Sequence, residues 1–366
     1  MGLVDLNEPM SFRDSMFLGM IFPRIVSVLP RCRVTSQTGL ISQSPRRGGA
    51  EMATATATNI KHVTFRNPDM YWDIAADIYF PPNFDENTSY PTIVAAHPIG
   101  SCKEQTAGNI YATALADAGY VAIAFDASFQ GESGGTPRFI EDPTQRVEDF
   151  RHVVDHLETL PYVDSDRIGV LGVCGGGGYT LNAAMTEKRF KAVVSITGVN
   201  YGRMIRENAA AADGVIAALQ TIGTQRSEYA RGGDPVVSGL LPESAEAAQQ
   251  VGDIDIIEAY DYYRTDRGQA SNGCVLFEAG HGAVALGWDA FHLAEELLTQ
   301  PLLVVVGDKQ GAFGAYRDGH EIIERAASKD KRLVVLEDVS HYDLYDQPKG
   351  AGEALKTVIP FFGEHL

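Results

Sequence analysis

A cysteine stands where an apolar run meets a series of glycines. Cys174 follows the run that begins at Ile168 and lies in the pattern Gly-Val-Cys-Gly-Gly of residues 172–176. This is the arrangement of a nucleophile elbow, Gly-x-nucleophile-x-Gly, whose strained turn leaves no room for a Cβ on the neighbouring residues. Residues 179–188 have helical periodicity, so the amide groups and dipole of that helix would point at the sulfur. The sequence therefore predicts a nucleophilic Cys174 with a lowered thiol pKa.

A thiol nucleophile needs a base, and His341 lies where that base is expected. In proteins with such an elbow, the acid and then the histidine follow the nucleophile along the chain, the histidine on the loop after the last strand. His341 comes directly after the last apolar run, residues 332–336. Because a thiol has a low pKa, a thiolate–imidazolium pair can form before substrate arrives. We expect Cys174 and His341 to form that pair.

The acid of the triad is open among three carboxylates. Asp308 is the only one in the loop after the penultimate strand run, and we assign it this role. In many proteins of this kind the acid stands two or three residues further on, where this chain has glutamine and glycine. The alternatives are Asp289, just before that strand run, and Asp338, three residues before the histidine.

Two further groups would complete an acyl-transfer site. The amide of Gly175, next to the nucleophile, and an amide of the loop after residues 91–97 would hold the oxyanion. Ile99 is our second donor, with Gly100 as the alternative. Tyr262 and Tyr263 are expected to line an acyl pocket, although aromatic side chains at such positions also serve packing.

Buried strands and helices alternate along most of the chain. Continuous Val/Ile runs between helical segments predict a parallel sheet with both faces covered. The alternation stops near residue 200 and resumes at residue 301, which predicts a helical cap at about residues 200–299. The expected strands are 60–66, 71–79, 91–97, 120–125, 168–173, 191–196, 301–306 and 332–336, and the expected helices include 109–118, 143–160, 179–188 and 354–362.

Composition excludes several classes of function. The formal net charge of −18 argues against nucleic acid or an anionic membrane as partner. No segment has the eighteen consecutive apolar residues of a membrane span. The four cysteines lie far apart without metal-ligand spacing, as expected of reduced thiols in the cytoplasm. We therefore expect a small-molecule acyl substrate and neither a metal nor another cofactor; a homodimer is compatible with the sequence.

The first fifty residues differ from the rest. They carry six arginines and no lysine, with many serines. We expect residues 1–52 to be a disordered extension that precedes a single domain at residues 53–366. The alternative is a mitochondrial transit peptide in residues 1–50, which would place the protein in mitochondria instead of the cytoplasm.

Five segments together resemble the α/β-hydrolase superfamily. They are Ala-His-Pro-Ile-Gly at 96–100, Phe-Asp-Ala-Ser-Phe-Gln-Gly-Glu-Ser at 125–133, the elbow at 172–176, Leu-Thr-Gln-Pro-Leu-Leu at 298–303 and Ser-His-Tyr-Asp at 340–343. Within the superfamily the chain looks most like dipeptidyl-peptidase-like and acetyl-xylan-esterase-like hydrolases and fungal polyketide transferases. Dienelactone hydrolase, which also has a cysteine nucleophile, is a more distant likeness.

The resemblance implies an α/β-hydrolase fold, a mostly parallel doubly wound sheet with a helical cap insertion. It also implies an acyl hydrolase or acyltransferase that acts through a covalent Cys174 acyl-enzyme. Because a thiolate leaves more readily than an alkoxide, thioesters, lactones and activated esters are expected to react better than simple alkyl esters. The alternative is a non-catalytic ligand-binding protein on the same scaffold.

Overall fold

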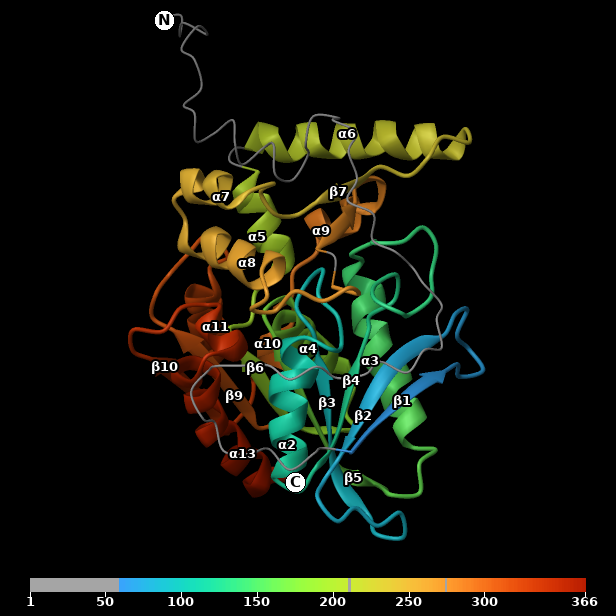
Figure 1. The fold of residues 1–366 in the computed structure, drawn as a ribbon, viewed down its shortest axis with the longest axis vertical. Coiled ribbons are helices and arrows are strands. Elements are labelled where there is room, and N and C mark those ends of the chain that lie inside the picture. Colours follow the sequence, from blue (N-terminus) through green and yellow to red (C-terminus); the bar gives the residue numbers. More distant parts are fainter. Residues whose placement is uncertain (1–58, 210–211, 274) are drawn as a thin grey trace, which may run out of the picture.

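An eight-stranded sheet forms the centre of the molecule (Figure 1). The computed structural model describes residues 59–209, 212–273 and 275–366, so the expectations for residues 1–52 lie outside the described residues. The strand order is β1-β2-β4-β3-β5-β6-β9-β10. Strand β2 pairs with β1 and β4 in antiparallel fashion, and every other neighbouring pair in this sheet is parallel. The strands are β1 (Asn59–Phe65), β2 (Ile74–Phe80), β3 (Tyr90–Ala96), β4 (Val121–Phe125), β5 (Val163–Val173), β6 (Phe190–Ile196), β9 (Leu302–Gly307) and β10 (Lys331–Leu336).

Helices cover both faces of this sheet, and each face has its own buried apolar cluster. One cluster contains side chains from α3 (Pro143–Leu157), α4 (Gly175–Thr186) and α11 (Ala315–Arg325). The other contains side chains from the π-helix η1 (Thr106–Ala112), α2 (Thr113–Asp117) and α13 (Glu353–His365). The predicted α/β-hydrolase fold is confirmed.

Most of the chain between β6 and β9 lies above one edge of the sheet, whereas α10 (Ala294–Leu297) lies lower, in contact with α4 and α11 (Figure 1). This region, which we call the cap (residues 200–299), is mainly helical. A short two-stranded antiparallel sheet within it was not expected from the sequence, because strands of three residues carry no readable alternation. The cap contains α5 (Tyr201–Asn208), α6 (Ala212–Ala230), β7 (Val237–Gly239), α7 (Ala245–Val251), α8 (Ile254–Arg264), β8 (Leu276–Glu278), η2 (Ala279–His281), α9 (Ala283–Gly287) and α10 (Ala294–Leu297).

Strand register brings the chemically interesting loops together. One row of paired residues crosses four neighbouring strands. It consists of Ala96 of β3, Gly172 of β5, Ser195 of β6 and Val304 of β9. Because these strands are parallel, the loops that follow them leave the sheet at the same edge. The cap covers this edge. Across the described residues, no helix combines the length and apolar character needed to cross a membrane.

Candidate active site

The turn that carries Cys174 is held by tight backbone contacts. Cys174 joins β5 to α4 with φ +56° and ψ −125°, a conformation that side chains rarely adopt. Its N–H donates to the Ile196 carbonyl at 3.0 Å. A Cβ at Gly172 would lie 2.2 Å from the Gly176 oxygen, and one at Gly176 would lie 2.6 Å from the Ala96 oxygen. The glycines are therefore required by geometry, as the elbow pattern indicates.

Burial favours the protonated thiol of Cys174, whereas the sequence predicted a lowered pKa. Cys174 is only 7% exposed, and burial raises its pKa to about 11. The Tyr345 hydroxyl and the Gly175 amide act in the opposite direction without overcoming burial. The expectation of a lowered thiol pKa is therefore wrong for the free protein, because desolvation disfavours the charged form more than the helix terminus favours it.

His341 is buried and is also uncharged. Burial lowers the pKa of its imidazole to about 3, so no thiolate–imidazolium pair exists at rest near pH 7. The Nδ1 atom lies 2.8 Å from the Thr197 hydroxyl oxygen. Among the described residues, no group forms a hydrogen bond with Nε2. A neutral ring held at Nδ1 with a free Nε2 is suited to accept a proton as substrate reacts.

Thr197 was missed by sequence reasoning. It follows β6 directly and has φ +42°, an unusual value for a β-branched residue. Its N–H donates to the Val305 carbonyl at 2.7 Å, which fixes it between β6 and β9. A single threonine after a buried strand carries no sequence signal for this role.

None of the three carboxylates proposed as the acid forms a hydrogen bond with the His341 ring in the described part of the chain. Asp308 is exposed, and its carboxylate accepts from the Val339 N–H at 3.3 Å. Asp338 is exposed and forms ion pairs with two lysines. Asp289 accepts from the Asn200 side chain at 2.7 Å. The assignment of Asp308 as the partner of His341 is therefore corrected: this position at Nδ1 belongs to Thr197.

The two expected oxyanion donors lie against each other. A Cβ at Gly175 would lie 2.4 Å from Cγ1 of Ile99, so the Ile99 side chain covers the start of α4. Among the described residues, no carbonyl or side-chain oxygen accepts a hydrogen bond from either amide. Gly100, the alternative donor, has φ +66° and its carbonyl accepts from the Val275 N–H of the cap.

A buried network holds the loop that carries Ile99. The His97 Nδ1 lies 2.6 Å from the Pro98 carbonyl, and its Nε2 accepts from the Ala127 N–H at 3.0 Å. Burial and the neighbouring Arg146 guanidinium keep the pKa of His97 well below its usual range. Arg146 donates to the His97 carbonyl at 2.8 Å and pairs with Glu141. A neutral histidine clamped by an arginine therefore fixes the backbone next to the expected oxyanion donor.

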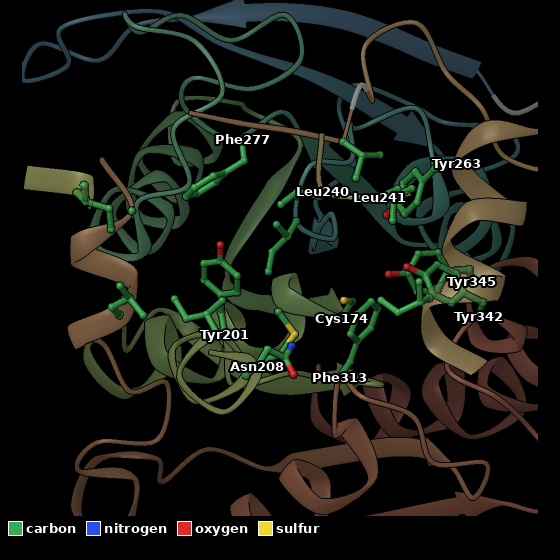
Figure 2. Close-up of a pocket in the computed structure, with 18 residues that line it drawn as sticks. Cys174, Tyr201, Asn208, Leu240, Leu241, Tyr263, Phe277, Phe313, Tyr342 and Tyr345 are labelled. Atoms are coloured by element: carbon green, nitrogen blue, oxygen red, sulfur yellow. The ribbon is translucent and has the colours of Figure 1, made fainter. Parts of the chain in front are cut away.

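Cys174 opens into an apolar cavity between the sheet edge and the cap (Figure 2). In Figure 2 its sulfur lies between Phe313, Tyr342 and Tyr345 on one side and Tyr201 and Asn208 on the other. Within the described part of the chain, no charged side chain lines this cavity. The remaining lining residues are Ile99, Met204, Ile205, Ile222, Leu240, Leu241, Ile256, Tyr263, Val275, Phe277, Gly282 and Leu286.

The two tyrosines predicted for the pocket have different positions. Tyr263 lines the cavity, whereas Tyr262 is not among its lining residues. Tyr262 packs behind the wall, with its ring 5.0 Å from that of Tyr345 and under the Arg267 guanidinium. Its pocket assignment is therefore corrected to a packing role. Tyr342 and Tyr345, which do line the cavity, were detectable only through their closeness to His341 in sequence.

The described residues contain no cluster of three His, Cys, Asp or Glu side chains able to hold a metal ion.

Comparison with known proteins agrees with the resemblance to α/β-hydrolases. Residues 72–240 match the family model of X-Pro dipeptidyl-peptidase (S15 family). The Escherichia coli protein YcjY is 40% identical over 80% of this chain and 94% of its own length. The solved structure of PA2218 from Pseudomonas aeruginosa is 32% identical with a TM-score of 0.75, covering 85% of this chain and 95% of that one. Thiohydrolase aneE from Aspergillus aculeatus is 32% identical over 29% of this chain and 33% of its own length. The chain therefore belongs to the family of YcjY and PA2218 and has the α/β-hydrolase fold.

Proposed function

We propose that this hydrolase acts on a thioester, lactone or activated ester with an apolar acyl group, through a covalent acyl-enzyme at Cys174. The observation that carries the proposal is the placement of Cys174 at a strained elbow that opens into an apolar cavity. The unpartnered Nε2 of His341 supports it, as do the amides of Gly175 and Ile99, which donate to no oxygen among the described residues.

The reaction starts from neutral groups. As the sulfur attacks the acyl carbonyl, its proton passes to Nε2 of His341 and the carbonyl oxygen becomes an oxyanion. The amides of Gly175 and Ile99 hold that oxyanion. Collapse breaks the bond to the leaving thiol or alcohol, which takes the proton from the imidazolium. Water, or an alcohol in acyl transfer, then attacks the Cys174 thioester, with His341 again accepting and returning the proton.

The cavity favours a neutral acyl chain over a peptide. Removal of a dipeptide from a chain terminus requires a place for a charged ammonium group, and burying an unpaired charge is costly. Among the described residues that line the cavity, none carries a charge that could pair with an ammonium group. The local similarity to a thiohydrolase points in the same direction. Peptidase activity, suggested by the match to the S15 model, is therefore the second candidate.

A substrate panel with covalent trapping tests the proposal. Full-length protein is incubated with an activated medium-chain thioester, the matching alkyl ester and a Xaa-Pro anilide, and adducts are mapped by mass spectrometry. We expect turnover of the thioester, an acyl adduct on Cys174, and loss of both in Cys174→Ala. Faster cleavage of the anilide would establish the peptidase instead. Ligand binding without adduct or turnover would indicate a non-catalytic binding protein.

A further inference from the structure

A buried carboxylate from the cap occupies the space of a missing side chain beside the active site. In many proteins of this fold the triad acid stands on the loop after β9, two or three residues beyond position 308, where this chain has Gln310 and Gly311. A Cβ built on Gly311 would lie 2.3 Å from Cγ of Asp255, which belongs to α8. The Asp255 carboxylate therefore stands where the first atoms of an acid at position 311 would project.

The position of Asp255 is fixed by the loop after β9. Its Oδ2 accepts from the Phe313 N–H at 2.8 Å. Asp253, the N-terminal capping residue of helix α8, accepts a hydrogen bond from the Ala312 N–H at 3.0 Å. Two carboxylates at the start of one helix thus bind two successive amides of the loop, which docks α8 onto the sheet domain.

Asp255 has no structural reason to carry a charge. It is 2% exposed, and no cation among the described residues forms an ion pair with it. Its Oδ1 is buried and has no hydrogen-bond partner in the described part of the chain. Burial, together with the nearby charges of Asp253 and Glu258, raises its pKa to about 7, although the hydrogen bond from the Phe313 N–H acts in the opposite direction. A buried acid left half-paired weakens a fold, and such groups gather at functional sites.

The charge of the Asp255 carboxylate acts on groups of the site. Its charge raises the pKa of the Cys174 thiol and of the Tyr342 hydroxyl. The His341 ring lies 5.2 Å from the Tyr342 ring and 5.3 Å, edge to face, from the Phe313 ring. Asp255 is thus anchored through the backbone of the residue whose ring packs on His341.

We propose that Asp255 is the positioning carboxylate of the site, carried by the cap, and that it stabilises the imidazolium of His341 during acyl transfer. Thr197 orients the ring but brings no charge. The sulfur starts as a neutral thiol and is uncharged again once it bonds to the acyl carbon, so the carboxylate opposes neither state of the sulfur. The proton has moved from sulfur to Nε2, and a negative charge nearby favours the cation that results. This inference rests on the proposed acyl-enzyme function.

Substitution in the full-length protein tests the role. We expect Asp255→Asn to lower kcat on the activated thioester at least tenfold with KM within about twofold. The pH profile separates this role from a structural one. In the wild type, kcat/KM falls as the pH drops below about 7 and Asp255 becomes protonated. Asp253, Glu258, Cys174 and Tyr342 face the carboxylate and remain in the variant, which should lose this acid limb.

Two matched variants complete the experiment. Asp261→Asn removes an exposed carboxylate of the same helix and should keep wild-type activity. The double variant Asp255→Gly, Gly311→Asp returns a carboxylate to the loop after β9 and should recover at least part of kcat relative to Asp255→Gly alone. Circular dichroism checks the fold of each.

The outcomes separate the two proposals. If wild-type protein acylates Cys174 and Asp255→Asn matches Asp261→Asn in kcat and acid limb, the role of Asp255 is refuted and the proposed function stands. If the wild type gives neither adduct nor turnover, the proposed function fails and the role of Asp255 fails with it. If Asp255→Asn does not fold, absence of recovery in the double variant relative to Asp255→Gly overturns the role.

Discussion

Removal of the Thr197 hydroxyl should disable His341 without disturbing the fold. The hydroxyl is the one group among the described residues that forms a hydrogen bond with the imidazole, at 2.8 Å from Nδ1. Thr197→Val keeps the size and β-branching of the side chain at φ +42° and removes the hydrogen bond alone. Thr197→Ser keeps the hydroxyl and loses a methyl group, so it is the matched control.

The size of the effect follows from burial. His341 is 4% exposed, so water cannot replace the lost partner. Leaving one buried donor or acceptor unsatisfied costs about 1–3 kcal/mol. If that cost falls on the transition state, where the ring must accept the proton in one orientation, kcat/KM decreases about 5- to 150-fold, since about 1.4 kcal/mol corresponds to tenfold in rate.

The assay is steady-state hydrolysis of the activated thioester with thermal unfolding measured in parallel. We expect Thr197→Val to lose activity in this range, with a Tm close to that of the wild type, and Thr197→Ser to retain most activity. Equal activity of both variants and the wild type would refute the orienting role. A loss shared by Thr197→Ser would show that the methyl group matters and the hydroxyl does not.

Four further outcomes follow from the geometry. The rate of Cys174 alkylation by iodoacetamide should rise about tenfold per pH unit from pH 8 to 10, because burial raises the thiol pKa to about 11; a plateau near pH 7 would contradict this. Asp308→Asn should change kcat/KM less than threefold, because the carboxylate is exposed and does not hydrogen-bond the histidine; a tenfold loss would restore it to the triad. Gly176→Ala should lower the free energy of unfolding by about 1–3 kcal/mol in denaturant titration, whereas Gly287→Ala, which meets no atom within 4 Å, should not. Asp255→Asn should raise Tm relative to the wild type at pH 8 and not at pH 4. The pKa of Asp255 is about 7 in the folded protein and about 3.9 in the unfolded chain. Ionisation of Asp255 therefore lowers the stability of the wild type as the pH rises from about 4 to about 7. An equal effect at both pH values would contradict that reasoning.

The sheet could be predicted from the sequence because its signals are local. For six of the eight predicted strands, both the first and the last residue agree with the observed strand to within one residue. The agreement is close because continuous Val/Ile runs favour buried strands. Strand β5 begins at Val163, five residues before the prediction, because polar residues at 164–167 separate Val163, which pairs with Tyr90 of β3, from the apolar run. The elbow and the histidine loop were equally local, since each is defined by a strand end.

The rest of the site depends on contacts between distant segments. The pairing of Thr197 with His341 joins residues 144 positions apart, and the approach of Asp255 to Gly311 depends on how α8 packs onto the loop after β9. The protonation of Cys174 depends on how fully the cap desolvates it, which no local pattern encodes. Sequence therefore located the strand ends, and packing decided which groups meet there and in what charge state.

The hydrogen bond from the Val275 amide to the Gly100 carbonyl links the cap directly to the loop that we propose to hold the oxyanion. A second link joins Gln105, which follows the same loop, to the Gly268 carbonyl. Exchange of the cap between relatives would therefore alter the transition state as well as the choice of substrate. Residues 200–299 and the loop after β3 should therefore be exchanged together in engineering. Changes of specificity are better sought by substituting residues that line the cavity than by replacing the cap alone.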